Sequence, residues 1–148
     1  MVERIISTKI NKEHYTADAC IVWCFDDRFS CLLGSFVRNA NYDRIDLVNI
    51  AGGAKGLASP ADDHERAYVL DQIEKSIRLH HAPQVVLMVH SECGAYGKSF
   101  SDADAEQSFY CNELHSAQNT VREFLSQKYS DVQVLKYYAD FDGLVKVS

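Results

Sequence analysis

The sequence predicts an α/β fold: a single domain over residues 1–148, with a mainly parallel central sheet of four strands plus a C-terminal hairpin, and helices on both faces. Three observations lead to this prediction: the length of 148 residues, four short apolar runs, and amphipathic helical patterns between these runs. Strands that alternate with helices are joined by right-handed crossovers, which makes the sheet parallel. Because ligands bind beyond the carboxyl ends of such strands, the residues that follow each strand are the first candidates for a functional site.

Four short apolar runs predict buried strands, and the first and third of them are almost continuously hydrophobic and rich in β-branched side chains. Runs that are almost continuously hydrophobic are typical of strands covered on both faces, as in a parallel sheet. The predicted strands cover residues 19–23, 45–50, 84–89 and 132–137. The following segment, 138–147, has an Asp-Gly pair between two apolar runs and therefore predicts a closing hairpin.

Helices are predicted between the strands, where apolar residues recur three and four positions apart. The first covers residues 29–37. The second begins with Ser59 as its N-cap, and its last turn carries His80 and His81. The third covers about residues 102–129.

The charge balance excludes some classes of partner. The chain has 15 basic and 21 acidic residues, with a formal net charge of −6. Nucleic acids and anionic lipid surfaces draw much of their binding energy from basic protein surface, so neither is an expected partner. No apolar run is long enough for a signal peptide or a membrane span, so we expect a cytoplasmic protein. Its five cysteines should then stay reduced, as free thiols or metal ligands.

Two of the predicted strand ends carry residue types that bind metal ions. The first strand is followed by Cys24, and the third is followed by His90 and Cys93. Two thiolates and one imidazole suit Zn²⁺, which prefers tetrahedral nitrogen and sulfur ligands, and three protein ligands would leave the fourth position open, as in catalytic zinc sites. The alternative is that the cysteines are small buried hydrophobes and the histidine is a hydrogen-bonded core residue. An acid and a base close to Cys24 favour the metal site.

Asp26 and Arg28, just after Cys24, are candidates for a catalytic acidic-basic pair. The alternative is a surface ion pair near a helix start, with Asp27 as the N-cap of that helix. The glycine-rich stretch 51–56 invites comparison with phosphate-binding loops, but it matches neither G-x-G-x-x-G nor G-x-x-x-x-G-K-[ST]. Its glycines are better explained as a place where the backbone passes close to the metal pocket.

The order and spacing of these residues resemble a known family. The pattern Cys24-x-Asp26-x-Arg28 followed by His90-x-x-Cys93-Gly94 resembles the paired signature of the β-class carbonic anhydrases. The segment 49–53 is similar to the Arg-Asn-Ala-Gly-Asn segment of that family, although Ile50 stands where the family has asparagine. The resemblance runs from about residue 19 to residue 97 and implies that Cys24, His90 and Cys93 hold a zinc ion.

The resemblance also implies roles for the neighbouring residues. Asp26 would accept a hydrogen bond from a zinc-bound hydroxide, and Arg28 would hold Asp26 by a charge-assisted bond. If that bond breaks, Asp26 could take the fourth position on the zinc and close the site. The implied reaction is the reversible hydration of carbon dioxide to bicarbonate. The substrate pocket would be lined by Gly52, Gly53 and Gly94.

The family further implies a homodimer or a higher homo-oligomer, with the active site at a subunit interface. Only about eighteen residues precede the first predicted strand, whereas the family carries a longer helical arm there that wraps the partner subunit. Three other functions stay open. They are a hydrolase of a linear analogue such as carbonyl sulfide or carbon disulfide, a non-catalytic zinc-binding or redox-responsive module, and a nucleotide-binding protein.

Overall fold

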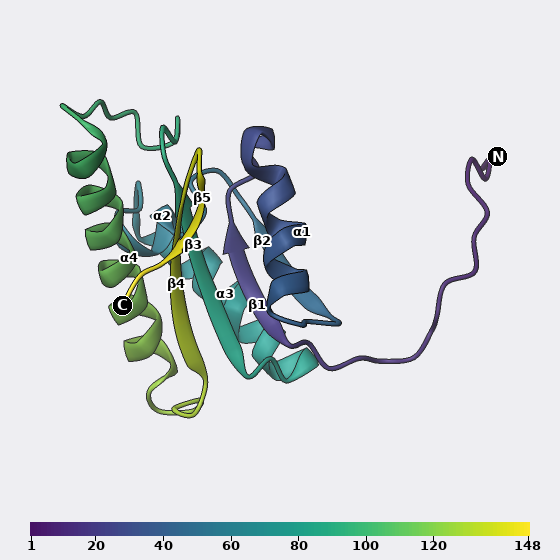
Figure 1. Cartoon of the computed structure of the whole chain (residues 1–148). Helices are drawn as coiled ribbons and strands as arrows, with labels where there is room; N and C mark the ends of the chain where they lie inside the picture. Colours follow the sequence, from purple (N-terminus) through teal and green to yellow (C-terminus); the bar gives the residue numbers. More distant parts are fainter.

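One sheet of five strands forms the centre of the molecule, in a computed structural model that describes residues 1–148 (Figure 1). The strands are β1 (Ala19–Trp23), β2 (Ile45–Asn49), β3 (Gln84–His90), β4 (Gln133–Asp140) and β5 (Gly143–Lys146). Their order is β2-β1-β3-β4-β5, with β5 antiparallel to β4 and the other neighbours parallel. The predicted α/β fold class is confirmed. The C-terminal hairpin is present as well, but its first arm is the end of β4.

The helices cover both faces of the sheet, as predicted. On one face lies α1 (Ser30–Asn39), whereas α3 (Asp63–His80) and α4 (Ala103–Leu125) pack on the other (Figure 1). A 3₁₀ turn, η1 (Asp27–Phe29), precedes α1, and a short helix, α2 (Lys55–Ala58), follows β2. None of the helices combines the length and the apolar character that crossing a bilayer requires.

The start of α3 differs from the prediction. Ser59 is not its N-cap: this residue ends α2, and its hydroxyl donates to the carboxylate of Glu113 at 2.6 Å. The cap is Asp62, whose side chain accepts a hydrogen bond from the backbone N–H of Glu65 at 2.9 Å. A carboxylate there also interacts favourably with the positive end of the helix dipole, which explains the later start. At the other end, His81 lies just beyond the helix with φ at 56°, the left-handed conformation that closes many helices.

The two central strands position the residues that follow them. Alternate side chains of β1 point to opposite faces, so Cys20 and Val22 pack toward α3 and α4, whereas Ile21 packs toward α1. β1 and β3 are parallel neighbours, and both are almost completely buried. Their carboxyl ends therefore lie side by side. Cys24 and His90 stand at this edge of the sheet.

The first fourteen residues form an extended segment, here called the N-terminal arm, that runs away from the body of the molecule (Figure 1). The exposed isoleucines of the arm are Ile5, Ile6 and Ile10. The arm joins the body at Tyr15, whose hydroxyl donates to Oδ1 of Asp46 at 2.6 Å. Tyr15 also packs against the ring of His80, with 4.1 Å between the ring centroids. The arm itself thus leaves apolar surface uncovered in the single chain.

Candidate metal centre

The structure brings Cys24, His90 and Cys93 together at the carboxyl edge of the sheet. Cys24 follows β1 directly, His90 is the last residue of β3, and Cys93 lies in the loop after it. The two sulfur atoms and one ring nitrogen lie within 4.8 Å of one another, and all three residues are buried. A group of this composition and spacing could hold a metal ion.

The imidazole of His90 is prepared to act as an electron-pair donor. Its Nδ1 lies 2.8 Å from the backbone carbonyl oxygen of Ser91. A carbonyl only accepts hydrogen bonds, so Nδ1 carries the proton and Nε2 carries the free lone pair. This Nε2 is buried and has no hydrogen-bond partner, which is costly unless something occupies the site. The rings of Phe29 and Trp23, at 4.5 and 5.9 Å between centroids, hold the imidazole from its face and its edge.

The two thiols of the cluster shift each other's pKa in opposite directions. A hydrogen bond from Cys93, helped by the backbone N–H of Gly52, lowers the pKa of Cys24 against the opposing effect of burial. The pKa of Cys93 is raised by its hydrogen bond to Cys24 and by burial. Zn²⁺ suits such a donor set, because it binds thiolate sulfur and neutral imidazole nitrogen and would compensate both thiolate charges.

Asp26 and Arg28 form a close pair beside this cluster. Arg28 Nη2 donates to Asp26 Oδ2 at 2.7 Å and Nε donates to Oδ1 at 3.1 Å. These bonds outweigh the opposing effect of burial and lower the pKa of Asp26 to about 2. Asp26 Oδ2 lies 3.9 Å from Nε2 of His90, so the carboxylate borders the position that a metal would take. The alternative that Asp27 caps the helix is wrong: Asp26 caps η1 by accepting from the backbone N–H of Arg28 at 3.0 Å.

Arg28 has further contacts that the sequence did not reveal. Its Nη2 donates to the carbonyl oxygen of Glu92 at 3.2 Å, and its Nη1 contacts the Glu92 carboxylate at 3.3 Å. The guanidinium also lies 5.7 Å from the ring centroids of both Phe29 and Phe141. Phe141 comes from the tip of the β4–β5 hairpin and gives no signal in the sequence, because its position near Arg28 depends on the complete sheet.

The three glycines predicted to line a substrate pocket occupy different environments. Gly52 donates its N–H to Cys24 Sγ at 3.3 Å, and its φ is 79°. Gly53, with φ at 56°, packs so closely on β3 that a Cβ atom would lie 2.3 Å from the carbonyl oxygen of Met88. Gly94 is exposed and has no atom within 4 Å of the place a Cβ would take. It lines a cleft of about 410 Å³ beside Cys93.

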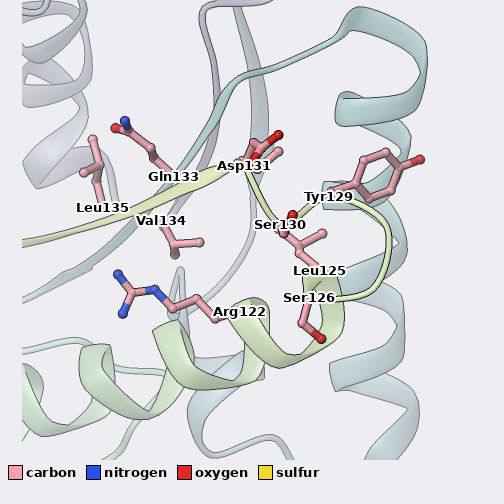
Figure 2. A pocket seen from close by; sticks show the side chains of 10 residues that line it. Arg122, Leu125, Ser126, Tyr129, Ser130, Asp131, Gln133, Val134 and Leu135 are labelled. Carbon is pink, nitrogen blue, oxygen red and sulfur yellow. The ribbon is translucent and has the colours of Figure 1, made fainter.

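A larger groove, of about 540 Å³, lies away from this site. Figure 2 shows Arg122 and Leu125 of α4 and Val134 and Leu135 of β4 around it. The groove lies at the start of β4, whereas the cysteines and His90 lie at the opposite, carboxyl end of the parallel strands. It contains none of the site residues predicted from the sequence, so its size does not make it the functional site.

The glycine-rich stretch 51–56 does not offer a free lysine to a phosphate group. Lys55 Nζ donates to the carbonyl oxygen of Ser59 at 2.9 Å and lies 5.7 Å from the ring centroid of Tyr96. The close packing of Gly53 on β3 agrees instead with the interpretation that these glycines let the backbone pass near Cys24.

Fold and site together define a class: an α/β protein with a buried Cys/His/Cys cluster at the carboxyl edge of a mainly parallel sheet. The family model described as "Putative carbonic anhydrase" matches residues 14–147, nearly the whole chain. The protein belongs to this carbonic anhydrase family. The resemblance inferred from the paired motifs is therefore confirmed.

Known proteins of similar sequence or structure are distant. An uncharacterised protein of Rickettsia bellii is 23% identical and covers 97% of this chain and 92% of its own length. The β-carbonic anhydrase isoform I of Trichomonas vaginalis superposes with a TM-score of 0.61 at 14% identity, covering 96% of this chain and 87% of that chain. A carbon disulfide hydrolase in its apo form gives a TM-score of 0.53 at 12% identity, covering 90% and 81% of the two chains. At such identities these structural likenesses concern the fold alone.

Proposed function

We propose that this protein is a zinc-dependent carbonate dehydratase, which hydrates carbon dioxide reversibly to bicarbonate. The observation that carries the proposal is the meeting of two thiols with a buried, unpartnered imidazole nitrogen, with the Asp26–Arg28 pair beside them. Membership of a carbonic anhydrase family supports the same reaction.

Cys24, His90 and Cys93 would hold the zinc ion. A zinc ion with three such ligands supplies a Lewis acid that lowers the pKa of a coordinated water toward neutrality. The chain prepares the ligands: the Ser91 carbonyl keeps the proton of His90 on Nδ1, and the Gly52 N–H stabilises negative charge on Cys24.

Asp26 orients the reacting water. Because the pKa of Asp26 is lowered to about 2, its carboxylate stays ionised at neutral pH and can only accept hydrogen bonds. Accepting one from the water turns an oxygen lone pair toward the carbon of the substrate. Arg28 makes this arrangement rigid, since its fork of nitrogens contacts both carboxylate oxygens at once.

The substrate enters through the cleft beside Cys93 and Gly94. Carbon dioxide is small, linear and uncharged, so it needs an open path more than it needs a charged partner. Gly94 leaves such a path, because no side chain projects there and no other atom lies within 4 Å of the Cβ position. The proposed substrate pocket therefore centres on Gly94. Gly52 contacts Cys24 through its N–H, and Gly53 lets the backbone pass close to β3.

A first experiment tests metal and activity together. The protein is purified without added zinc, its metal content is measured, and hydration of carbon dioxide is followed by stopped flow. We expect one zinc per chain and hydration far above background. Cys93→Ser should lose both, whereas Cys31→Ser, at an exposed cysteine outside the cluster, should keep both. Absence of zinc, or equal behaviour of the two variants, would contradict the proposal.

A second candidate function is hydrolysis of carbon disulfide or carbonyl sulfide at the same site. The structural likeness to a carbon disulfide hydrolase supports it at the level of the fold. Rates measured on all three linear substrates with the same preparation separate the two functions. Zinc at one per chain with no turnover of any of them would instead favour a non-catalytic zinc-binding module.

We further propose that the protein is a homodimer or a higher homo-oligomer and that it works in the cytoplasm. The exposed isoleucines of the N-terminal arm support association, because a second copy would bury them. A reducing compartment suits the site, because Cys24 and Cys93 must stay reduced to bind the metal.

A further inference from the structure

Helix α4 reaches the loop that carries Cys93. Two residues of α4 one turn apart, Glu106 and Tyr110, point at the segment after β3. Glu106 Oε2 accepts a hydrogen bond from Ser91 Oγ at 2.7 Å, and Oε1 accepts from the backbone N–H of Glu92 at 2.7 Å. The hydroxyl of Tyr110 accepts from the backbone N–H of Cys93 at 3.3 Å.

Three successive backbone N–H groups of this loop therefore have three separate acceptors. The N–H of Ser91 donates to the Ala139 carbonyl of β4 at 2.8 Å, and the next two donate to Glu106 and Tyr110. The loop is neither helix nor strand, so these contacts replace the regular ladder that would otherwise fix its path.

The middle residue of the loop adopts an unfavourable backbone conformation. Glu92 has φ at 52°, a region that residues with a side chain seldom occupy. Glu106 holds its N–H on one side, and Arg28 holds its carbonyl oxygen on the other at 3.2 Å. Without such restraints the peptide would relax, and the direction of the following Cys93 side chain would change.

The same contacts lead to the imidazole. The carboxylate of Glu106 binds the hydroxyl of Ser91, and the carbonyl of Ser91 accepts the Nδ1 proton of His90 at 2.8 Å. The carboxylate of Glu106 is thus linked to His90 through two hydrogen bonds of Ser91. It also holds the backbone of Glu92, the residue just before Cys93.

We propose that Glu106 and Tyr110 are positioning residues that hold His90 and Cys93 in the geometry a metal ion requires. This inference rests on the proposed function, since it needs the three-residue cluster to bind metal. The neighbouring packing supports it: Tyr110 is buried and stacks on Tyr138 with 5.6 Å between ring centroids, so its hydroxyl is held in place.

The test compares metal binding in Glu106→Ala, Glu106→Gln and Tyr110→Phe with that in Glu123→Ala, an exposed residue near the other end of α4. Zinc affinity is measured by competition with a chromophoric chelator, and the ligand geometry is read from the visible absorption spectrum after loading with Co²⁺. Neither readout requires turnover. Unfolding by urea is measured on the metal-free proteins in parallel.

Glu106→Ala should weaken zinc binding by about 10- to 100-fold and alter the Co²⁺ spectrum, as is usual when a residue that orients metal ligands is lost. Glu106→Gln should stay within about threefold of wild type, because its amide oxygen can accept from Glu92 and its amide nitrogen can donate to Ser91. Tyr110→Phe, which loses only the acceptor for Cys93, should weaken binding by several-fold. Glu123→Ala should match wild type.

Wild-type zinc affinity and an unchanged Co²⁺ spectrum in Glu106→Ala would overturn the positioning role while leaving the proposed function intact. If the alanine variant does not fold, the glutamine and phenylalanine variants decide: a large loss of affinity in Glu106→Gln, or none in Tyr110→Phe, would overturn it. Wild-type protein that binds neither Zn²⁺ nor Co²⁺ would remove the proposed function and this inference together.

Discussion

Arg28 holds the carboxylate of Asp26 through two nitrogens, with Nη2 at 2.7 Å from Oδ2 and Nε at 3.1 Å from Oδ1. The pair lies only two residues apart in the chain, and the turn η1 allows the side chains to meet. Asp26 is thereby kept 3.9 Å from Nε2 of His90, beside the cluster and turned toward the guanidinium. In the proposed mechanism this arrangement separates two roles: Cys24, His90 and Cys93 would bind the metal, and Asp26 would accept a hydrogen bond from the reacting water.

Replacing Asp26 should remove activity without removing metal. In Asp26→Ala the three ligand atoms are untouched, so we expect zinc at the wild-type level and a hydration rate lower by roughly 100-fold or more. Stopped-flow hydration together with metal analysis checks this. The neighbouring Asp27→Ala serves as the control, because Asp27 is exposed and lies outside the Asp26–Arg28 pair. Full activity in Asp26→Ala would exclude Asp26 from the mechanism.

Arg28→Lys should be far from conservative. Lysine keeps the charge but loses the planar fork, so it cannot contact both oxygens of Asp26 together with the Glu92 carbonyl. A freed carboxylate could turn toward the metal, and we expect hydration to fall by roughly 100-fold while zinc is retained. Arg44→Lys, at another exposed arginine far from the cluster, should leave the rate unchanged. Equal rates in both lysine variants would show that the bidentate contact is dispensable.

Close packing on β3, in addition to a positive φ, excludes a side chain at position 53. Gly53→Ala and Gly97→Ala both place a side chain at positive φ, 56° and 59°, which costs about 1–2 kcal/mol in each case. Only at Gly53 would the new Cβ lie 2.3 Å from a backbone oxygen, that of Met88. Overpacking adds about 1–3 kcal/mol, so urea unfolding should show Gly53→Ala as the less stable variant by that margin. Similar stabilities would mean that β3 can move aside.

The sequence predicts those parts of the molecule that depend on neighbours along the chain. The apolar runs locate β1 and β3, and the sequence places the cysteines and the histidine just beyond their ends. That the two strands are neighbours, so that these residues meet, comes from the structure. The structure agrees with these strands to within a residue at each end: the sequence predicts a strand over 84–89, and β3 is Gln84–His90. The glycine-rich composition of residues 51–56 likewise predicts the close backbone approach that Gly53 makes to β3.

What the sequence could not provide are contacts between residues far apart in the chain. Glu106 and Tyr110 lie on a helix whose apolar stripe explains the burial of Tyr110, but nothing local indicates that both reach the loop after β3. Phe141 reaches Arg28 only because β4 continues into β5. The choice of Asp62 over Ser59 as helix cap likewise depends on Glu113 of α4, which takes the serine hydroxyl.

The N-terminal arm offers a test of the oligomeric state. Removal of residues 1–13 deletes the exposed isoleucines but keeps Tyr15, whose hydrogen bond to Asp46 attaches this end of the chain to the body of the molecule. If the arm holds subunits together, light scattering should give a dimer or larger assembly for the full chain and a smaller one after deletion. The double variant Lys9→Gln and Lys12→Gln serves as the control. It changes the charge of the arm but keeps its isoleucines, so it should not alter the mass of the assembly. An unchanged mass after deletion would rule out the arm as the means of association.

Asp46 gives a prediction on pH. Burial alone would raise the pKa of its carboxyl, but hydrogen bonds from Tyr15, Ser76 and His80, at 2.6, 2.7 and 2.8 Å, outweigh burial and lower it. A pKa below the unfolded value of about 3.9 means that the folded state favours the ionised form. The resulting stability is fully present above that value and is lost as the pH falls through the lower, folded pKa. Asp46→Asn should therefore cost about 1–3 kcal/mol at pH 7, as hydrogen bonds to a charged group do.

The same substitution should matter less in acid, because below the unfolded pKa of about 3.9 the ionised carboxylate of the folded state contributes progressively less to stability. Urea unfolding of wild type and Asp46→Asn at pH 7 and at about pH 3 measures the difference in the free energy of unfolding, which should shrink on acidification. Asp71→Asn is a suitable control, since its main partner is Lys75 in an exposed pair on α3 at 2.6 Å, and such pairs contribute little. If the difference in the free energy of unfolding between wild type and Asp46→Asn did not change with pH, the charge of the Asp46 carboxylate would have no role in stability. Its contribution would then come from packing and from neutral hydrogen bonds.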